Sequence, residues 1–235
     1  MTPSGRICLD MHVHSHFSAD ASTDPRTIAR GWGQSGILPI VCDHNSIKGA
    51  EATYRLIRER SPNVPVILAE EILTSEGEIV GLFLNEEIPP YLPAAETLDV
   101  IADQGALSLV PHPFCTYRST AIRRETLLEL GHRIDIVEGY NARNVTRQAN
   151  VEALRFAEER GKPVSVGSDA HTPFELCSTY AILEPFDSPD GLIRSLRTAE
   201  FRYRKVHPSL HQISKRIRAE KRSAPRNRKV PAVRI

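Results

Sequence analysis

The chain has 235 residues, a length that suits one large domain or two small ones. Hydrophobic residues make up 40% and charged residues 25%, which is ordinary for a globular protein and excludes collagen-like, wholly disordered and disulfide-scaffold classes. The four cysteines form no C-x-x-C pair and no apolar stretch approaches the roughly 20 residues of a membrane helix. We therefore expect reduced thiols and a cytoplasmic protein without a membrane partner.

The net charge of +1 conceals an uneven distribution along the chain. From residue 202 onward there are 12 basic residues and a single acidic one, whereas residues 1–201 contain 18 basic and 28 acidic residues. The apolar pattern also fades after His207. We therefore divide the chain into an acidic domain at residues 1–201 and a basic, flexible extension at residues 202–235, through which the protein could contact nucleic acid.

Short β-branched runs alternate with amphipathic helical patterns through residues 1–201, which is typical of βα units and a mainly parallel sheet. A capping side chain precedes proline at Asp24 and at Ser188, so helices should begin there. The polar segment before residue 79 contains Gly77, so the strands on either side of it could form a hairpin. The expected strands span residues 6–11, 37–42, 64–69, 79–84, 106–110, 134–137, 164–166 and 180–183.

The number and spacing of these strands decide between two α/β architectures. Seven or eight strands with intervening helices in about 200 residues favour a (β/α) barrel. The alternative is a doubly wound sheet, but no glycine-rich dinucleotide loop follows the first expected strand.

Potential metal ligands follow six of the expected strands, at the point where each strand ends. In a parallel barrel these ends face the same way, so residues far apart in the sequence would meet at one site. In extended backbone an H-x-H or D-x-H pair also presents both side chains on one side. Imidazole and carboxylate groups without clustered cysteines suit a catalytic divalent metal rather than a structural thiolate site. The six groups are His12-Val-His14, Asp43-His44, Glu70-Glu71, His112-Pro113, Glu138 with Asn141, and Asp169-Ala-His171.

These motifs resemble those of the PHP family, the polymerase and histidinol phosphatase domain. The resemblance extends from about Asp10 to His171, and weakly on to Arg197. It implies a distorted (β/α)7 barrel, a site for two or three divalent ions (zinc, manganese or iron, with magnesium as a further option), and hydrolysis of phosphoesters. The segments that carry it are Asp10-Met-His12-Val-His14, Ser18-Ala-Asp20, Val41-Cys-Asp43-His44, Glu71-Ile72, His112-Pro113, Glu138-Gly-Tyr-Asn141 and Gly167-Ser-Asp169-Ala-His171.

The resemblance also implies a role for each matched residue. Either Glu138 or Asn141 would supply a ninth ligand, and Asp43 would orient an imidazole. Glu71 would bridge two metals, and His14 or His171 could assist the leaving group, so His14, Glu71 and His171 are the expected catalytic residues. The expected metal ligands are His12, His14, Asp20, His44, Glu71, His112, Asp169 and His171.

Two arginines near these motifs, Arg118 and Arg143, are placed to bind a substrate phosphate, although each could equally be a solvated surface residue. We therefore expect a metal-dependent phosphoesterase that acts on a small phosphate monoester or a nucleotide. The alternatives are a nuclease acting on polynucleotide ends and a non-catalytic metal-binding regulatory module.

Overall fold

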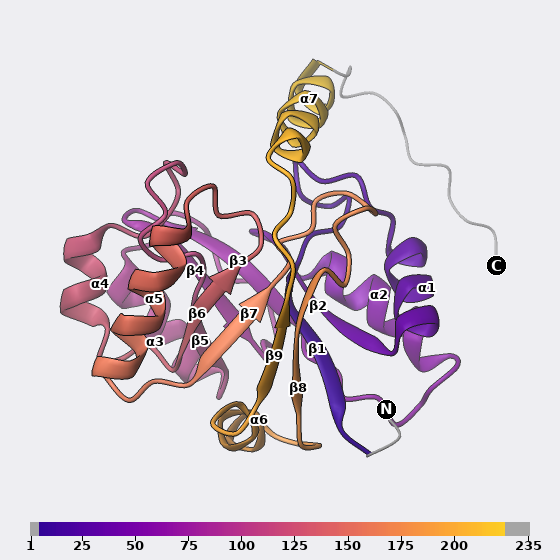
Figure 1. Cartoon of the computed structure of the whole chain (residues 1–235), viewed down its shortest axis with the longest axis horizontal. Helices are drawn as coiled ribbons and strands as arrows, with labels where there is room; N and C mark the ends of the chain where they lie inside the picture. The colour runs from indigo at the N-terminus through magenta and orange to yellow at the C-terminus, as the bar shows by residue number, and fades with distance from the viewer. Residues whose placement is uncertain (1–4, 224–235) are drawn as a thin grey trace.

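The computed structural model describes residues 5–223. Within that range the chain forms nine strands and seven helices, and strands and helices alternate along most of it (Figure 1). The strands are β1 (Ile7–Val13), β2 (Ile37–His44), β3 (Ala69–Thr74), β4 (Gly77–Leu82), β5 (Leu107–Val110), β6 (Ile136–Asn141), β7 (Val164–Gly167), β8 (Thr179–Leu183) and β9 (Glu200–Tyr203). The helices are α1 (Pro25–Ser35), α2 (Lys48–Arg58), α3 (Ala94–Asp103), α4 (Arg124–Leu130), α5 (Arg147–Glu159), α6 (Pro189–Leu196) and α7 (Ser209–Ser223).

The strands form one sheet in the order β7-β6-β5-β4-β3-β2-β1-β8-β9. Beyond the end of β7 the chain returns to β1, where the Asp169 amide donates to the His12 carbonyl at 2.7 Å and the His14 amide donates to the Ala170 carbonyl at 2.9 Å. These bonds join the two ends of the strand series and nearly close the sheet. Strands β4 and β8 run antiparallel to their neighbours, which distorts the barrel. The expectation of a distorted barrel is confirmed, and the doubly wound alternative is excluded.

The third strand lies later in the chain than the sequence indicates. Residues 64–68 precede it without joining the ladder, and β3 pairs with β4 from Ala69 to Thr74. The hairpin is confirmed, because β3 and β4 pair in antiparallel register up to Thr74 and Gly77. Gly77 follows the turn with a φ of 130°, and a Cβ there would lie 2.3 Å from the Ile122 Cα. The shift places Glu70 and Glu71 inside the strand rather than after it. Strand β9 was not expected.

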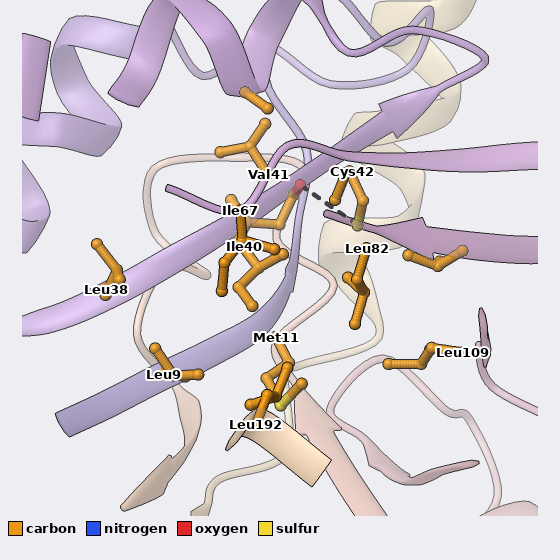
Figure 2. Packing of buried hydrophobic residues seen from close by; sticks show 14 of the residues in the cluster. Leu9, Met11, Leu38, Ile40, Val41, Cys42, Ile67, Leu82, Leu109 and Leu192 are labelled. Carbon is orange, nitrogen blue, oxygen red and sulfur yellow. Dashed lines mark hydrogen bonds between the residues drawn. The ribbon is translucent and has the colours of Figure 1, made fainter. Parts of the chain in front are cut away.

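Nearly every residue of the first two strands is buried, whichever face of the strand it is on. Residues Leu9 and Met11 of β1 and Ile40 of β2 are at most 1% exposed and pack with Leu82 of β4 (Figure 2). Parallel strands covered on both faces are typical of barrels. This packing fixes β1 and β2, and with them the histidines at their carboxyl ends.

The two proline-marked helix starts are confirmed. The Asp24 side chain accepts a hydrogen bond from the Arg26 amide at 2.8 Å, and Ser188 does the same for the Gly191 amide at 3.2 Å. Each cap satisfies one backbone donor that the first helical turn leaves open.

The basic extension contains a helix that the sequence analysis did not expect. Helix α7 stands beyond the sheet in Figure 1, at the top of the view, whereas β1 begins near the bottom. Residues 224–235, with four of the basic residues of the extension, lie outside the described range. The domain boundary at residue 201 and the flexibility of the extension stay predictions. No helix among residues 5–223 is long and apolar enough to cross a membrane.

Candidate metal centre

Seven of the eight matched ligands meet in overlapping groups of three at one end of the barrel. Within each group the candidate ligand atoms lie within 4.8 Å of one another. Asp20, from the loop after β1, joins them through its Oδ1, which is 3.4 Å from the His44 Nε2 and 3.5 Å from the His171 Nε2. The groups are His14, His44 and His171; His12, His14 and Glu71; His12, His112 and Asp169; and His44, Glu71 and Glu78.

Glu71 lies at the centre of this cluster and is 1% exposed. Its Oε1 is 3.0 Å from the His112 Nε2, and its Oε2 is 3.3 Å from the His14 Nε2 and 3.0 Å from the His44 Nδ1. Burial alone would raise the pKa of this carboxyl, but the His12 and His44 rings outweigh it and hold the pKa well below its usual value. Glu71 therefore presents a charged oxygen to either side, as a bridging ligand must.

Hydrogen bonds orient the rings of three histidines. The Nδ1 atoms of His12, His14 and His171 face Glu138 Oε1 at 3.1 Å, Ser18 Oγ at 3.1 Å and the Asp169 carbonyl at 2.8 Å. Burial lowers the pKa of His14 and of His171, and in these two rings a proton on Nδ1 leaves the Nε2 lone pair directed into the cluster. Burial, followed by the neighbouring His171 and His44 rings, lowers the pKa of His14 to about 4. A neutral imidazole of this kind is the form that binds metal.

Asp43 supports the cluster without touching an imidazole. Its two oxygens accept hydrogen bonds from the backbone and hydroxyl of Ser15 and of Ser18, with both hydroxyls at 2.6 Å. Ser18 Oγ then faces the His14 Nδ1 and accepts from the His44 amide at 3.1 Å. A Cβ on Gly49 of α2 would lie 1.8 Å from the Asp43 Oδ2, so only glycine fits beside this network.

Glu138 and Asn141 lie outside the groups of potential ligands. Glu138 accepts from the His112 amide at 2.5 Å and faces the His12 Nδ1. The Asn141 Nδ2 donates to Glu138 and to Asp169 Oδ2, both at 3.0 Å. Both side chains are therefore hydrogen-bonded to ligand residues in this structure.

The backbone is strained at two of the matched residues. His112 and Asp169 have φ values of 31° and 54°, in the left-handed region that L-residues rarely adopt. Such strain persists where the surrounding contacts enforce it, and it is frequent at functional sites.

Sequence reasoning missed Glu78, which completes one of the groups. Its carboxylate lies 3.6 Å from the His44 Nδ1 and 3.7 Å from the His112 Nε2, and the residue is 3% exposed. The hairpin register explains its position, because Glu78 pairs with Leu73 and Glu71 pairs with Val80, so both glutamates are on one face. The turn of the hairpin is visible in the sequence. The strand expected at residues 64–69 ends too early in the chain, however, to give the register between Glu71 and Glu78.

Several buried polar atoms in the cluster have no hydrogen-bond partner among the described residues. Buried polar atoms are nearly always paired, so each unpaired one needs an explanation. Carboxylate and imidazole atoms that converge without partners are what a divalent ion would satisfy. The residues therefore fit the metals that the motifs imply. The unpaired atoms are Asp20 Oδ1, Glu78 Oε2, His112 Nδ1 and Asp169 Oδ1.

A cavity of about 270 Å³ opens beside the cluster and contains both expected phosphate-binding arginines. Arg118 pairs with Asp169. Burial alone would lower the pKa of Arg118, but the Asp169 carboxylate has the largest opposing effect and the pKa is raised. Arg143 is 4% exposed and lies 3.2 Å from Glu175. The surface alternative therefore fails for Arg143, while Arg118 is partly buried at the cavity wall.

Comparison with known proteins finds a matching family model and similar proteins. The PHP-associated family model PHP_C matches residues 147–201. The uncharacterized protein MJ0417 of Methanocaldococcus jannaschii is 33% identical over 189 residues, which cover 78% of this chain and 74% of the relative.

Two solved structures share the fold. One is a two-domain protein from Bacteroides vulgatus that contains a predicted PHP-like metal-dependent phosphoesterase; it is 19% identical with a TM-score of 0.63, over 90% of this chain and 70% of the other. The other is PsfC from Pseudomonas syringae, 16% identical with a TM-score of 0.60, over 92% of this chain and 99% of the other.

Proposed function

This chain belongs to the PHP family, and from that premise we propose that it is a metal-dependent phosphoesterase that hydrolyses a small phosphate monoester or nucleotide. The observation that carries the proposal is the convergence of five histidines with Asp20, Glu71 and Asp169, in which several buried ligand atoms lack partners. The motif resemblance and the fold shared with the Bacteroides vulgatus protein support it further.

We assign the ligands from their atoms. His12, His14, Glu71 and Asp169 would hold one metal. Glu71 would also be a ligand of a second metal, together with His112 and Glu78. Asp20, His44 and His171 would hold a third. Glu138 and Asn141 then act by orienting ligands rather than as the ninth ligand, because their contacts are with His12, His112 and Asp169.

Divalent cations bound there would lower the pKa of the attacking water and offset the negative charge of the phosphoryl group. The protein itself supplies the orientation of the substrate. The guanidinium groups of Arg118 and Arg143 line the cavity next to the cluster, where they can donate charge-assisted hydrogen bonds to phosphate oxygens.

The roles of His14 and His171 follow from their surroundings. Burial lowers the pKa of both rings, so both are neutral near pH 7 and suited to hold metal. A neutral imidazole has no proton to give beyond the Nδ1 proton that each already donates. We therefore propose that these two histidines and Glu71 contribute to catalysis as ligands.

The test is a reconstitution experiment on the full chain. Chelator-stripped protein is loaded separately with manganese, zinc, iron and magnesium, bound metal is counted, and phosphate release is measured from an aryl phosphate and a nucleotide panel. We expect two or three ions per chain and metal-restored release. The His12→Ala and Asp169→Ala variants should lose at least about 100-fold in kcat/KM, because each removes a ligand.

The matched control is His132→Ala, since His132 is exposed and faces only the Glu129 carbonyl. This variant should keep full activity and metal content. Metal binding without turnover of any monomeric substrate would instead favour a nuclease that acts on polynucleotide ends. Absence of bound metal would favour a regulatory module and overturn the enzyme proposal.

A further inference from the structure

Helix α7 places basic side chains over the cavity, and we propose that Lys215 and Arg218 bind a second anionic group of the substrate, next to the phosphate that is hydrolysed. This inference rests on the proposed function, because it concerns the substrate of the same site. It makes α7, which lies in the basic extension, part of the substrate-binding site.

The face that α7 turns toward the cavity is polar. His211, Ser214, Lys215 and Arg218 all line the cavity, at the i, i+3, i+4 and i+7 spacing of one helical face. Ser214 is 6% exposed, whereas the apolar Ile213 is 39% exposed. Leu210 and Ile217 are only half-buried, and Ser214 is the one residue of the helix that is buried. Burial of apolar surface therefore contributes less to the position of this helix than in an ordinary amphipathic helix.

Polar contacts hold α7 against the site instead. The Lys221 Nζ donates to the carbonyl oxygens of His16, Ser18 and Ala21 at 2.6 to 2.7 Å, which lie in the loop that carries Asp20. Arg218 donates to the Asp20 Oδ2 at 2.5 Å. The helix is therefore fixed relative to the metal centre through the same loop that supplies one of its ligands.

A second bond joins the middle of α7 to the opposite wall. The Arg143 Nη2 donates to the Ser214 Oγ at 3.0 Å, so the helix and the expected phosphate-binding arginine are connected directly. Lys215 follows Ser214 in the chain. Arg143 and Lys215 line the same cavity, so one small substrate can reach both.

The charges in the cavity leave one cation unpaired. Arg118, Arg143 and Arg218 each face a carboxylate, from Asp169, Glu175 and Asp20 respectively. No ion pair of Lys215 occurs within residues 5–223, although Lys215 lies on the cavity wall. Burial, and next the positive charge of Arg143, lowers the pKa of His211 to about 4, so this neighbour is neutral at pH 7.

The Lys215 ammonium has no ion pair among the described residues, and the Arg218 guanidinium pairs with Asp20 through only one of its nitrogens. Together they can bind an anion. The cavity volume of about 270 Å³ fits a small molecule with two anionic groups. A substrate with a single phosphate would leave Lys215 without a partner, so α7 should discriminate between the two kinds of substrate.

Binding of non-hydrolysable probes tests the proposal apart from catalysis. Calorimetry on the manganese-loaded full chain compares propylphosphonate with propane-1,3-diylbisphosphonate. The wild type should bind the bisphosphonate about 10-fold more tightly, and Lys215→Ala should remove most of that preference. Arg216→Ala is the matched control, because Arg216 is an exposed cation of the same helix that does not line the cavity. It should keep the preference.

Equal affinity of the wild type for the two probes would overturn the proposal, as would an equal loss for both probes in Lys215→Ala. Tighter binding of a 5′-phosphorylated tetranucleotide than of the bisphosphonate, lost in Lys215→Ala, would overturn the small-molecule substrate in favour of a polynucleotide. Thermal melting checks that the variants fold.

Hydrolysis of propane-1,3-diol phosphate and its 1,3-bisphosphate separates this inference from the proposed function. A preference in binding without hydrolysis of any phosphoester would support the role of α7 and contradict the phosphoesterase. Hydrolysis without a preference for the bisphosphate would support the phosphoesterase and overturn the role of α7.

Discussion

At the scale of single residues, the metal centre is a set of buried carboxylates and imidazoles that need each other. Glu71 lies within 3.6 Å of four histidines, while Glu78 approaches two of them and has one oxygen without a partner among the described residues. Burial and the adjacent Glu71 raise the pKa of Glu78, which indicates that its charge is costly in this position. A ligand that gains a cation would recover that cost.

We therefore expect Glu78→Gln to weaken metal binding. The amide keeps the shape of the side chain but removes its charge, so the affinity for one ion should fall about 10- to 100-fold, a loss typical of changes around metal sites. Metal content per chain, measured by mass spectrometry after equilibration with a chelator, reports the change. Glu96→Gln is the control, because Glu96 is an exposed residue on α3. Unchanged metal content in Glu78→Gln would remove Glu78 from the site.

At the scale of elements, the site depends on how closely β7 approaches β1. A Cβ on Gly167 would lie 2.3 Å from the His12 Cβ and 2.7 Å from the Glu138 Oε1. The hydrogen bonds that close the barrel lie next to this contact, at Asp169 and Ala170. Glycine at the end of β7 therefore allows the two strands to bring His12 and Asp169 into the same cluster.

Gly167→Ala should separate these strands and lower the free energy of unfolding by about 1 to 3 kcal/mol, the usual cost of overpacking. Bound metal should fall as well, because His12 moves. Urea denaturation and metal counting measure the two effects. Gly33→Ala in α1 is the control: a Cβ there meets nothing within 4 Å, so this variant should be stabilised by about 0.5 to 1 kcal/mol. Equal stability of the two variants would contradict the close-approach argument.

At the scale of the whole molecule, acidic residues of the barrel and basic residues of α7 meet at the candidate metal centre. The barrel concentrates Asp20, Glu71, Glu78 and Asp169 at one of its ends, and the basic helix α7 lies over that end. The folded protein therefore brings acidic and basic side chains together around one cavity. Metals that bind only the folded state should add to its stability.

Removal of metal should accordingly lower the thermal stability. Ligand linkage at concentrations about 100 times the dissociation constant contributes about 2.7 kcal/mol, which corresponds to a fall in Tm of about 5 to 10 °C for a chain of this length. Calorimetric scans with and without a chelator, followed by re-addition of manganese, measure it. His12→Ala should show a smaller difference than His132→Ala. A Tm that does not respond to chelation in the wild type would contradict a metal site that is formed by folding.

The sequence by itself determined the alternation of strands and helices, the proline-marked starts of α1 and α6 and eight candidate ligands that the structure brings together. These follow from local patterns: apolar periodicity, caps, and a spacing of two residues within extended strands. The structure confirms the barrel. The same order of strands closes the sheet and brings the histidines at the carboxyl ends of the strands to one end of the barrel.

Tertiary structure alone decided the features that depend on register and distant contacts. The position of Glu78 follows from the hairpin register of β3 and β4, and the hydrogen bonds of Glu138 with His112 and of Asn141 with Asp169 join residues that are far apart in the sequence. The apolar residues of α7 do not predict its docking, because its polar contacts with the loop after β1 are made by Lys221 and Arg218, which bind backbone and carboxylate oxygens about 200 residues away in the chain. Local patterns cannot specify such contacts, since their energy arises only when the barrel has brought both ends together.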